Sequence, residues 1–192
     1  MGDDDDVIEW YEPVFRGIFP LDQFHVSRST RRLLNRTPFH VEVDQRFTEV
    51  VLACGSDAAG RDGTWITAPI IEAYSRLQAQ GNAHSIEVMD GTRLVGGLYG
   101  VRLGSAFFGE SMFSYVTGGS KIALVHTAAR LQTAGFQLFD VQYQTEHLRS
   151  FGCVEISRGK YRHLLRSALH EERRFPNSLS ATQLADFVAE SH

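Results

Sequence analysis

Lysine is almost missing from this sequence. Lys121 and Lys160 are its two lysines, so arginine carries nearly all of the positive charge. The planar guanidinium of arginine can donate two parallel hydrogen bonds to a phosphate, although such a bias is equally typical of genome composition. Acidic residues outnumber basic ones and the net charge is −4. Any contact with nucleic acid must therefore come from a local basic patch rather than from the whole surface.

Cysteine and long apolar runs are scarce as well. Cys54 and Cys153 lie far apart, without the spacing of a disulfide framework or a zinc site, which indicates buried free thiols and no metal centre. The run from Asp3 to Asp6 reads as a solvated chain end rather than a metal site. There is neither an apolar stretch of about 18 residues nor a secretory signal pattern. We therefore expect a cytoplasmic protein without a membrane span.

Hydrophobic periodicity and turn residues predict an α+β domain in a chain of 192 residues. The aromatic, proline-punctuated stretch 10–20 is not expected to be a regular helix and is either a wall of a site or a packed irregular arm. The predicted helices cover residues 27–36, 47–55, 67–81, 120–134, a turn near Glu146, 160–169 and 180–190; the predicted strands cover 40–44, 84–89, 93–103, 105–115 and 136–143. Three antiparallel strands, a helix and a strand parallel to its neighbour follow the order of GNAT-type acyltransferases, although fold analogy alone does not fix the reaction.

A basic stripe follows the first predicted helix. Ser27 is a suitable N-cap, and Arg28, Arg32 and Arg36 recur at i, i+4 and i+8, with Arg31 beside them. No acidic residue interrupts these four arginines. The stripe is either a solvated helix face or a contact for a phosphate backbone.

Three clusters break local sequence rules. Glycines between Gly96 and Gly100 weaken a strand interior, which suggests close approach by a ligand or another backbone. Glu110 is a lone acid among apolar residues, and a buried acid needs a partner or a task. Asp140 and Gln142 alternate on a strand, so both are expected on one face. Alternatively, the glycines relieve crowding, Glu110 pairs with an arginine, and Asp140 ends a strand. The convergence of all three on one sheet favours a functional site.

Several of these segments occur in a known family. In order and spacing, the chain resembles leucyl/phenylalanyl-tRNA–protein transferases from roughly Trp10 to Arg166. The resemblance is carried by GTWIT (63–67), AHSIE (83–87), LVGGLYGV (94–101), FGESMFS (108–114), Ser120-Lys121 and Asp140-x-Gln142.

The resemblance implies a GNAT-like acyltransferase fold and an aminoacyltransferase. Such an enzyme takes leucine or phenylalanine, and methionine less well, from Leu-tRNA or Phe-tRNA. It places the amino acid on proteins that begin with Arg or Lys, which marks them for degradation by the N-end rule. Neither a metal nor CoA is implied as a cofactor. We expect a monomer in which a shortened N-terminal segment, residues 1–22, precedes a GNAT-like domain at residues 23–192.

The resemblance also assigns roles to individual residues. Asp140 would orient the acceptor amine, directly or through a relay, while Gln142 would position it and Glu110 would pair with the cationic end of the acceptor. The general base is either a side chain or the 2′-hydroxyl of the tRNA. Trp65 would stack on the terminal adenosine of the tRNA, and Leu98, Phe107, Gly109, Leu131 and Phe139 would surround the apolar side chain.

Two other functions fit the same elements. A CoA-dependent N-acetyltransferase would need a pyrophosphate-binding loop at a helix N-terminus, which the turn 117–120 imitates weakly. A noncatalytic protein that binds tRNA or a peptide would keep the scaffold without turnover. The joint presence of Asp140, Gln142 and Glu110 argues against that second alternative.

Overall fold

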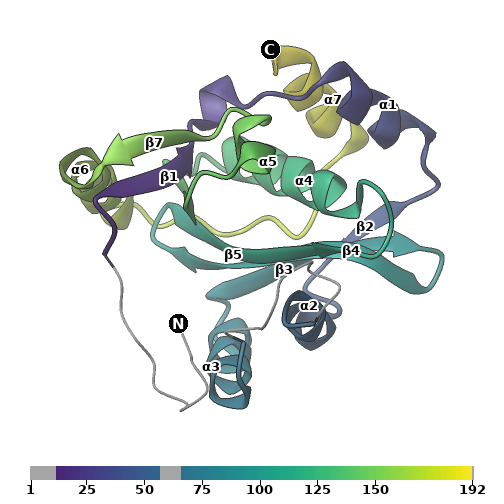
Figure 1. Cartoon of the computed structure of the whole chain (residues 1–192), viewed down its shortest axis with the longest axis horizontal. Coiled ribbons are helices and arrows are strands. Elements are labelled where there is room, and N and C mark those ends of the chain that lie inside the picture. The colour runs from purple at the N-terminus through teal and green to yellow at the C-terminus, as the bar shows by residue number, and fades with distance from the viewer. Residues whose placement is uncertain (1–11, 57–65, 192) are drawn as a thin grey trace.

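The computed structural model describes residues 12–56 and 66–191. Within these residues the chain forms a mixed seven-stranded sheet flanked by helices (Figure 1), so the predicted α+β class is confirmed. The strands lie in the spatial order β2-β3-β4-β5-β6-β1-β7. They are β1 (Phe15–Phe19), β2 (His40–Val43), β3 (Ala83–Asp90), β4 (Arg93–Leu103), β5 (Ala106–Ser114), β6 (Leu138–Gln142) and β7 (Val154–Ser157).

The helices begin and end close to the predicted positions. Ser27 caps the first helix by accepting a hydrogen bond from the backbone of Thr30, and Ser180 forms the predicted capping box with Gln183. The helices are the 3-10 turn η1 (Leu21–Gln23), α1 (Arg28–Arg36), α2 (Phe47–Cys54), α3 (Ala68–Ala79), α4 (Gly119–Thr133), α5 (Glu146–Arg149), α6 (Arg158–Leu169) and α7 (Ala181–Glu190).

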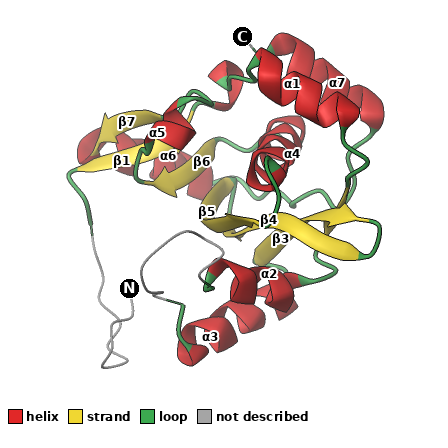
Figure 2. Ribbon diagram, turned by 45° about the vertical axis from the view of Figure 1, so that its right-hand side comes forward, coloured by secondary structure: helices red, strands yellow, loops and turns green. Residues whose placement is uncertain are grey.

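The sheet has two covered faces. Helix α4 crosses one face, and α1 and α7 lie side by side on its outer side (Figures 1 and 2). Helices α2 and α3 cover the opposite face below β3 and β4. Phe19 packs with the α4 core, whereas the adjacent Ile18 packs with residues of α6. Because neighbouring residues of a strand point to opposite faces, α6 lies on the side away from α4.

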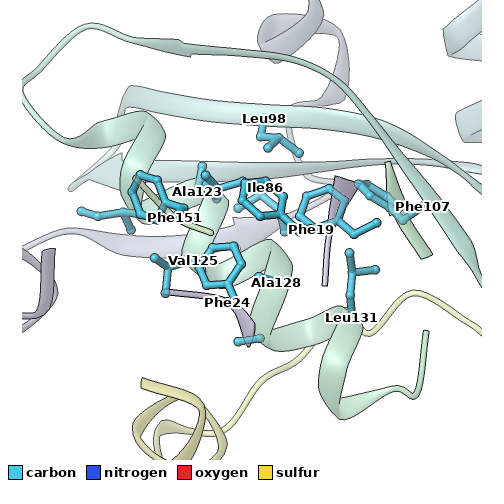
Figure 3. Close-up of a cluster of buried hydrophobic side chains, with 14 of the residues drawn as sticks. Phe19, Phe24, Ile86, Leu98, Phe107, Ala123, Val125, Ala128, Leu131 and Phe151 are labelled. Carbon is cyan, nitrogen blue, oxygen red and sulfur yellow. The ribbon is translucent and has the colours of Figure 1, made fainter. Parts of the chain in front are cut away.

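The main core fills the space between the sheet and α4. Figure 3 shows Ile86 and Leu98 of the sheet facing Ala123 and Ala128 of the helix. Helix α4 is buried along most of its length because the sheet covers one side and α1 and α7 cover the other. In the part of the chain that the structure describes, no helix is long and apolar enough to cross a membrane.

Residues 15–19 are not helical, as expected, but the alternative of an irregular arm is wrong for them. They form β1, which pairs antiparallel with β6 on one side and β7 on the other. Pro13 and Pro20 lie outside this strand, where they remove no ladder hydrogen bond. Strand β7 was also not predicted from the sequence. Strand β1 thus belongs to the same sheet as the rest of the chain, and the expected division at residue 22 falls between β1 and α1.

Candidate active site

A cavity lies where β5 and β6 diverge. The two strands pair in parallel, as predicted, but their ladder ends at the pair Phe108–Asp140. Beyond this pair the strands line a cavity of about 360 Å³, within the size range of small-molecule sites. Its walls come from both strands and from α4 and α5, and they comprise Leu98, Gly109, Glu110, Ser111, Met112, Leu124, Val141, Gln142, Tyr143, Thr145 and Leu148.

A β-bulge presents Glu110 to this cavity. Tyr99 pairs with Ser111 and Gly100 pairs with Gly109, so Glu110 is the extra residue on β5. A bulge re-aims the side chain that it carries, and bulges are common beside active sites. Gly100 permits this geometry because a Cβ there would lie 2.3 Å from the carbonyl oxygen of Phe108. Gly100 is therefore required by a close backbone approach, as predicted for the glycines of the segment 96–100.

Glu110 carries a perturbed carboxyl group. Burial, together with the nearby charge of Asp140, raises the pKa of Glu110 to about 7. A hydrogen bond from the Tyr74 hydroxyl and the charge of Arg16 act in the opposite direction but do not cancel the effect of burial. The side chain remains partly accessible through the cavity. Glu110 can therefore change its protonation state near neutral pH at the wall of the cavity.

Asp140 has a different environment. Its side chain is completely buried, and its carboxylate accepts hydrogen bonds from three groups. Arg16 donates from Nε at 3.0 Å and from Nη2 at 2.8 Å. The Tyr161 hydroxyl donates at 2.5 Å, and the backbone N–H of Gln142 donates at 2.7 Å. Asp140 thus ties β6 to β1 and α6.

Arg16 is a site residue that the sequence did not reveal. Burial lowers its pKa, but the hydrogen bond and the charge of Asp140 outweigh burial, so the pKa of Arg16 is raised. Its guanidinium also lies 5.0 Å from the ring centroid of Tyr161. The one available signal was a single arginine within the apolar segment from Val14 to Phe19. Its partner is 124 residues away, so local reasoning could not connect the two.

Gln142 lines the cavity, but regular alternation does not place it there. Its φ is +60°, in the left-handed region that residues other than glycine seldom adopt. Gln142 lines the cavity, whereas Asp140 is completely buried and does not line it. The 2.7 Å bond from the Gln142 backbone to Asp140 holds this conformation.

The apolar wall differs from the expected one. Leu98 and Gly109 line the cavity as predicted. Phe107, Leu131 and Phe139 are fully buried in the core between the sheet and α4, so they support the wall from behind. Trp65 lies outside the described residues. The apolar lining instead includes Met112, Leu124, Val141 and Leu148, which are as hydrophobic as the predicted residues and could not be distinguished from them by composition.

The basic stripe of α1 is present with one exception. Arg28, Arg32 and Arg36 are exposed. Arg31 is only partly exposed, and its guanidinium donates to the carbonyl oxygens of Val26 and Ser191. Arg31 therefore connects α1 to the end of α7, and the other three arginines form the accessible stripe.

The N-terminus of α4 is closed by packing. A Cβ at Gly118 would lie 2.3 Å from Leu33 Cδ2, and one at Gly96 would lie 2.7 Å from the backbone of Gly119. The Ser114 hydroxyl accepts a hydrogen bond from the backbone N–H of Ser120 at 3.1 Å. Protein groups thus occupy the helix end at which an acyl-CoA pyrophosphate would have to bind.

Comparison with known proteins identifies the family. A family model described as leucyl/phenylalanyl-tRNA protein transferase matches residues 18–166. The chain belongs to this family.

The leucyl/phenylalanyl-tRNA–protein transferase of Maricaulis maris (strain MCS10) is 48% identical over 193 residues, which cover 99% of this chain and 89% of that protein. The protein of the same name from Hyphomonas neptunium (strain ATCC 15444) is 52% identical over 166 residues, or 86% of this chain and 64% of its own length. The family predicted from the motifs, and with it the assignment as a transferase, is confirmed.

Proposed function

We propose that this chain transfers leucine or phenylalanine, and methionine less well, from aminoacyl-tRNA to the N-terminal amine of proteins that begin with Arg or Lys, marking them for N-end-rule degradation. The observation that carries the proposal is the cavity between β5 and β6, with apolar side chains on its walls and Glu110 and Gln142 at its polar end. We propose a GNAT-like scaffold on related grounds, because the order β4-β5-α4-β6 leads to two parallel strands that diverge at this cavity.

The proposed reaction converts an ester to an amide. The amine nitrogen attacks the ester carbonyl carbon, the bond to the ribose oxygen breaks, and the tRNA leaves with a free hydroxyl group. The amine gives up a proton and the leaving oxygen gains one, so atoms and charge balance. Because an amide is more stable than an ester, the transfer needs no ATP, and the resemblance to the family implies neither a metal nor CoA. The enzyme has to orient the reactants and stabilise the developing oxyanion.

Glu110 suits the amine side of this reaction. The acceptor arrives with an α-ammonium whose pKa is about 8. A carboxyl group with a pKa of about 7 is well matched to pair with that ammonium and accept its proton near neutral pH. The hydroxyl group of Tyr74, on helix α3, lowers the pKa of Glu110 but does not cancel the effect of burial. Glu110 is thus the group that we propose to contact the reacting amine.

Asp140 acts through Gln142 in this proposal. A fully buried carboxylate with Arg16 and Tyr161 as partners is not positioned to hold an amine directly, which favours the relay over direct contact. Its bond to the backbone of Gln142 fixes the left-handed turn that brings the Gln142 side chain to the cavity. Gln142 then orients the amine through its amide group, which both donates and accepts hydrogen bonds. Asp140 is a positioning residue.

The rest of the substrate would use the remaining surfaces. The apolar wall formed by Leu98, Met112 and Leu124 fits a leucyl or phenylalanyl side chain. We propose that Arg28, Arg32 and Arg36 contact tRNA phosphates, as expected from the sequence, and that Trp65 stacks on the terminal adenosine. The closed N-terminus of α4 argues against the CoA-dependent alternative.

The test is transfer of labelled leucine from leucyl-tRNA to a peptide that begins with arginine. We expect transfer to require the tRNA-bound amino acid and a free N-terminal arginine, and to be lost when the peptide is N-acetylated. Asp140→Asn keeps the size of the side chain and removes its charge, so it should reduce transfer at least 100-fold. Asp90→Asn is the matched control, because Asp90 is exposed in a hairpin and pairs only with nearby Arg93 across the turn.

Each alternative has its own outcome. Acetyl transfer from acetyl-CoA to the same peptide would replace the proposal by the N-acetyltransferase. Binding of leucyl-tRNA without transfer would indicate a noncatalytic binding protein. Failure of the wild-type chain to bind either substrate would overturn the proposed function.

A further inference from the structure

Helix α6 carries a strongly basic surface that the roles above do not use. Its residues, Arg158 to Leu169, include four Lys or Arg side chains and no acidic one, although the whole chain has a net charge of −4. Lys160, Arg162 and Arg166 are exposed, and Arg158 is partly exposed. A local patch of this kind is the feature by which an acidic protein can contact nucleic acid.

Two arginines of this helix already hold an anion. Arg162 donates from Nε and Nη2 to the two carboxylate oxygens of Glu12, each at 2.8 Å. Arg158 approaches the same carboxylate at 3.9 Å and donates to the backbone carbonyl of Glu12 at 3.2 Å. The paired, parallel geometry is the one that arginine also uses for phosphate. About half of the Glu12 side chain is exposed, so a ligand phosphate can reach and replace it.

This basic surface of α6 is connected to strand β6. Tyr161 stands between Lys160 and Arg162 in the sequence, and its hydroxyl group bonds to Asp140 of β6 at 2.5 Å. The start of α6 is also fixed to β1, because the Arg158 backbone N–H donates to Val14 at 3.0 Å. Tyr161 and Arg158 thus connect the basic helix to β1 and to β6, whose residues Val141 and Gln142 line the cavity.

We propose that Arg158 and Arg162 bind a backbone phosphate of the aminoacyl-tRNA near its 3′ end, and that Glu12 occupies this position when tRNA is absent. The inference rests on the proposed function, since it assumes a tRNA substrate. Glu12 acts as an internal competitor: its carboxylate must leave the two arginines before the phosphate binds. A purely structural ion pair would instead make Glu12 and Arg162 equally necessary for the fold.

The test compares Arg162→Ala, Glu12→Gln and the double variant by the Kd for leucyl-tRNA at several salt concentrations. Arg162→Ala should raise the Kd about five- to tenfold and reduce the slope of log Kd against log salt by about 0.7, the value for one phosphate of a single strand. Glu12→Gln should lower the Kd two- to fivefold, because the competing charge is removed. In the Arg162→Ala background it should change the Kd little.

A small substrate distinguishes effects at the α6 surface from effects at the cavity. Leucyl-adenosine carries the same ester but no preceding phosphate, so its transfer to the arginine peptide should be unchanged in Arg162→Ala. Arg93→Ala, which removes an exposed arginine from the β3–β4 hairpin, is the control for nonspecific loss of charge. Thermal unfolding checks that each variant is folded.

The outcomes distinguish this inference from the proposed function. An unchanged Kd and salt slope in Arg162→Ala, or weaker tRNA binding in Glu12→Gln, would overturn the phosphate site while leaving the transfer reaction intact. An equal loss with leucyl-adenosine would also overturn it, because the effect would then lie in the cavity. If wild-type protein neither binds leucyl-tRNA nor transfers leucine, the proposed function itself fails.

Discussion

Glu110 and Asp140 lie on the two strands that diverge at the cavity, and both carboxyl groups are surrounded by protein. Asp140 has Arg16, Tyr161 and a backbone N–H as partners, and no part of its side chain is exposed. The hydroxyl group of Tyr74 and the charge of Arg16 lower the pKa of Glu110, but burial outweighs them and the pKa is about 7. Burial thus has different consequences for the two carboxyl groups. Asp140, which is paired with an arginine, becomes a fixed structural anchor. Glu110, whose close neighbour is a neutral hydroxyl group, titrates near neutral pH.

The largest expected effect comes from removing the cation that fixes Asp140. Arg16→Ala would leave a fully buried carboxylate without its ion-pair partner, which costs about 3 kcal/mol or more. We expect a loss of unfolding free energy of that size in urea denaturation and a fall in transfer of at least 100-fold. Arg16→Lys keeps the charge but not the paired hydrogen bonds, so it should be intermediate.

A stable and active Arg16→Ala variant would contradict the assignment of Asp140 as an anchor. Arg93→Ala serves as the control, because Arg93 is exposed and pairs with exposed Asp90, and such surface pairs contribute about 0–1 kcal/mol.

The second effect concerns Glu110 and pH. If the carboxylate form contacts the amine, wild-type transfer should rise as the pH increases through about 7, and Glu110→Gln should remove that rise and lower the rate at pH 8 at least tenfold. The measurement is kcat/KM from pH 5.5 to 8.5 with both proteins. An unchanged pH profile in the variant would show that Glu110 does not titrate in the reaction, since the acceptor amine would then account for the whole profile.

The titration of Glu110 also makes the stability of the folded protein depend on pH. The pKa of Glu110 is about 7 in the folded protein and 4.5 by its ordinary value, so the folded state retains the proton more strongly. This contribution to stability is fully present below pH 4.5 and is lost as the pH rises through 7. Relative to Glu110→Gln, the wild-type protein should therefore lose unfolding free energy between about pH 4.5 and 7, as measured by urea denaturation at each pH.

A smaller effect is expected from the hydroxyl group on the anchored side. Tyr161→Phe removes one hydrogen bond to Asp140 but leaves Arg16 and the Gln142 backbone in place. Transfer should fall about three- to tenfold, which corresponds to the roughly 0.5–1.5 kcal/mol that a typical hydrogen bond contributes. The pH profile should keep its midpoint, because Glu110 is unaffected. A shifted midpoint would indicate that Tyr161 acts on Glu110 instead.

The smallest change in rate is expected for the tyrosine on the titrating side. The hydrogen bond from Tyr74 lowers the pKa of Glu110, so Tyr74→Phe should raise that pKa and move the midpoint of the pH profile upward. Transfer at pH 8.5 should change about twofold or less. Tyr161→Phe removes the corresponding hydroxyl group beside Asp140, so the two variants can be compared directly. Tyr161→Phe should lower the rate of transfer, whereas Tyr74→Phe should move the midpoint of the pH profile.

Sequence reasoning was most accurate where local signals decide the structure. The Ser27 cap and the capping box at Ser180 set helix starts, and both were predicted because their donor and acceptor are three residues apart. The β3-β4-β5 meander followed from alternation and turn glycines. Strand β1 was missed because its few residues become a strand only by pairing with β6 and β7, more than 100 residues further along the chain.

The sequence by itself determined the helices, most of the strands and the family, and it singled out Glu110, Asp140 and Gln142 as candidate site residues. Only the tertiary structure decided how these side chains are used. It brought Arg16 to Asp140, turned Gln142 toward the cavity, and placed Met112 rather than Phe107 on the cavity wall. The physical reason is that burial, charge pairing and the pKa of Glu110 depend on contacts between distant segments, whereas helix caps and alternation depend on neighbouring residues.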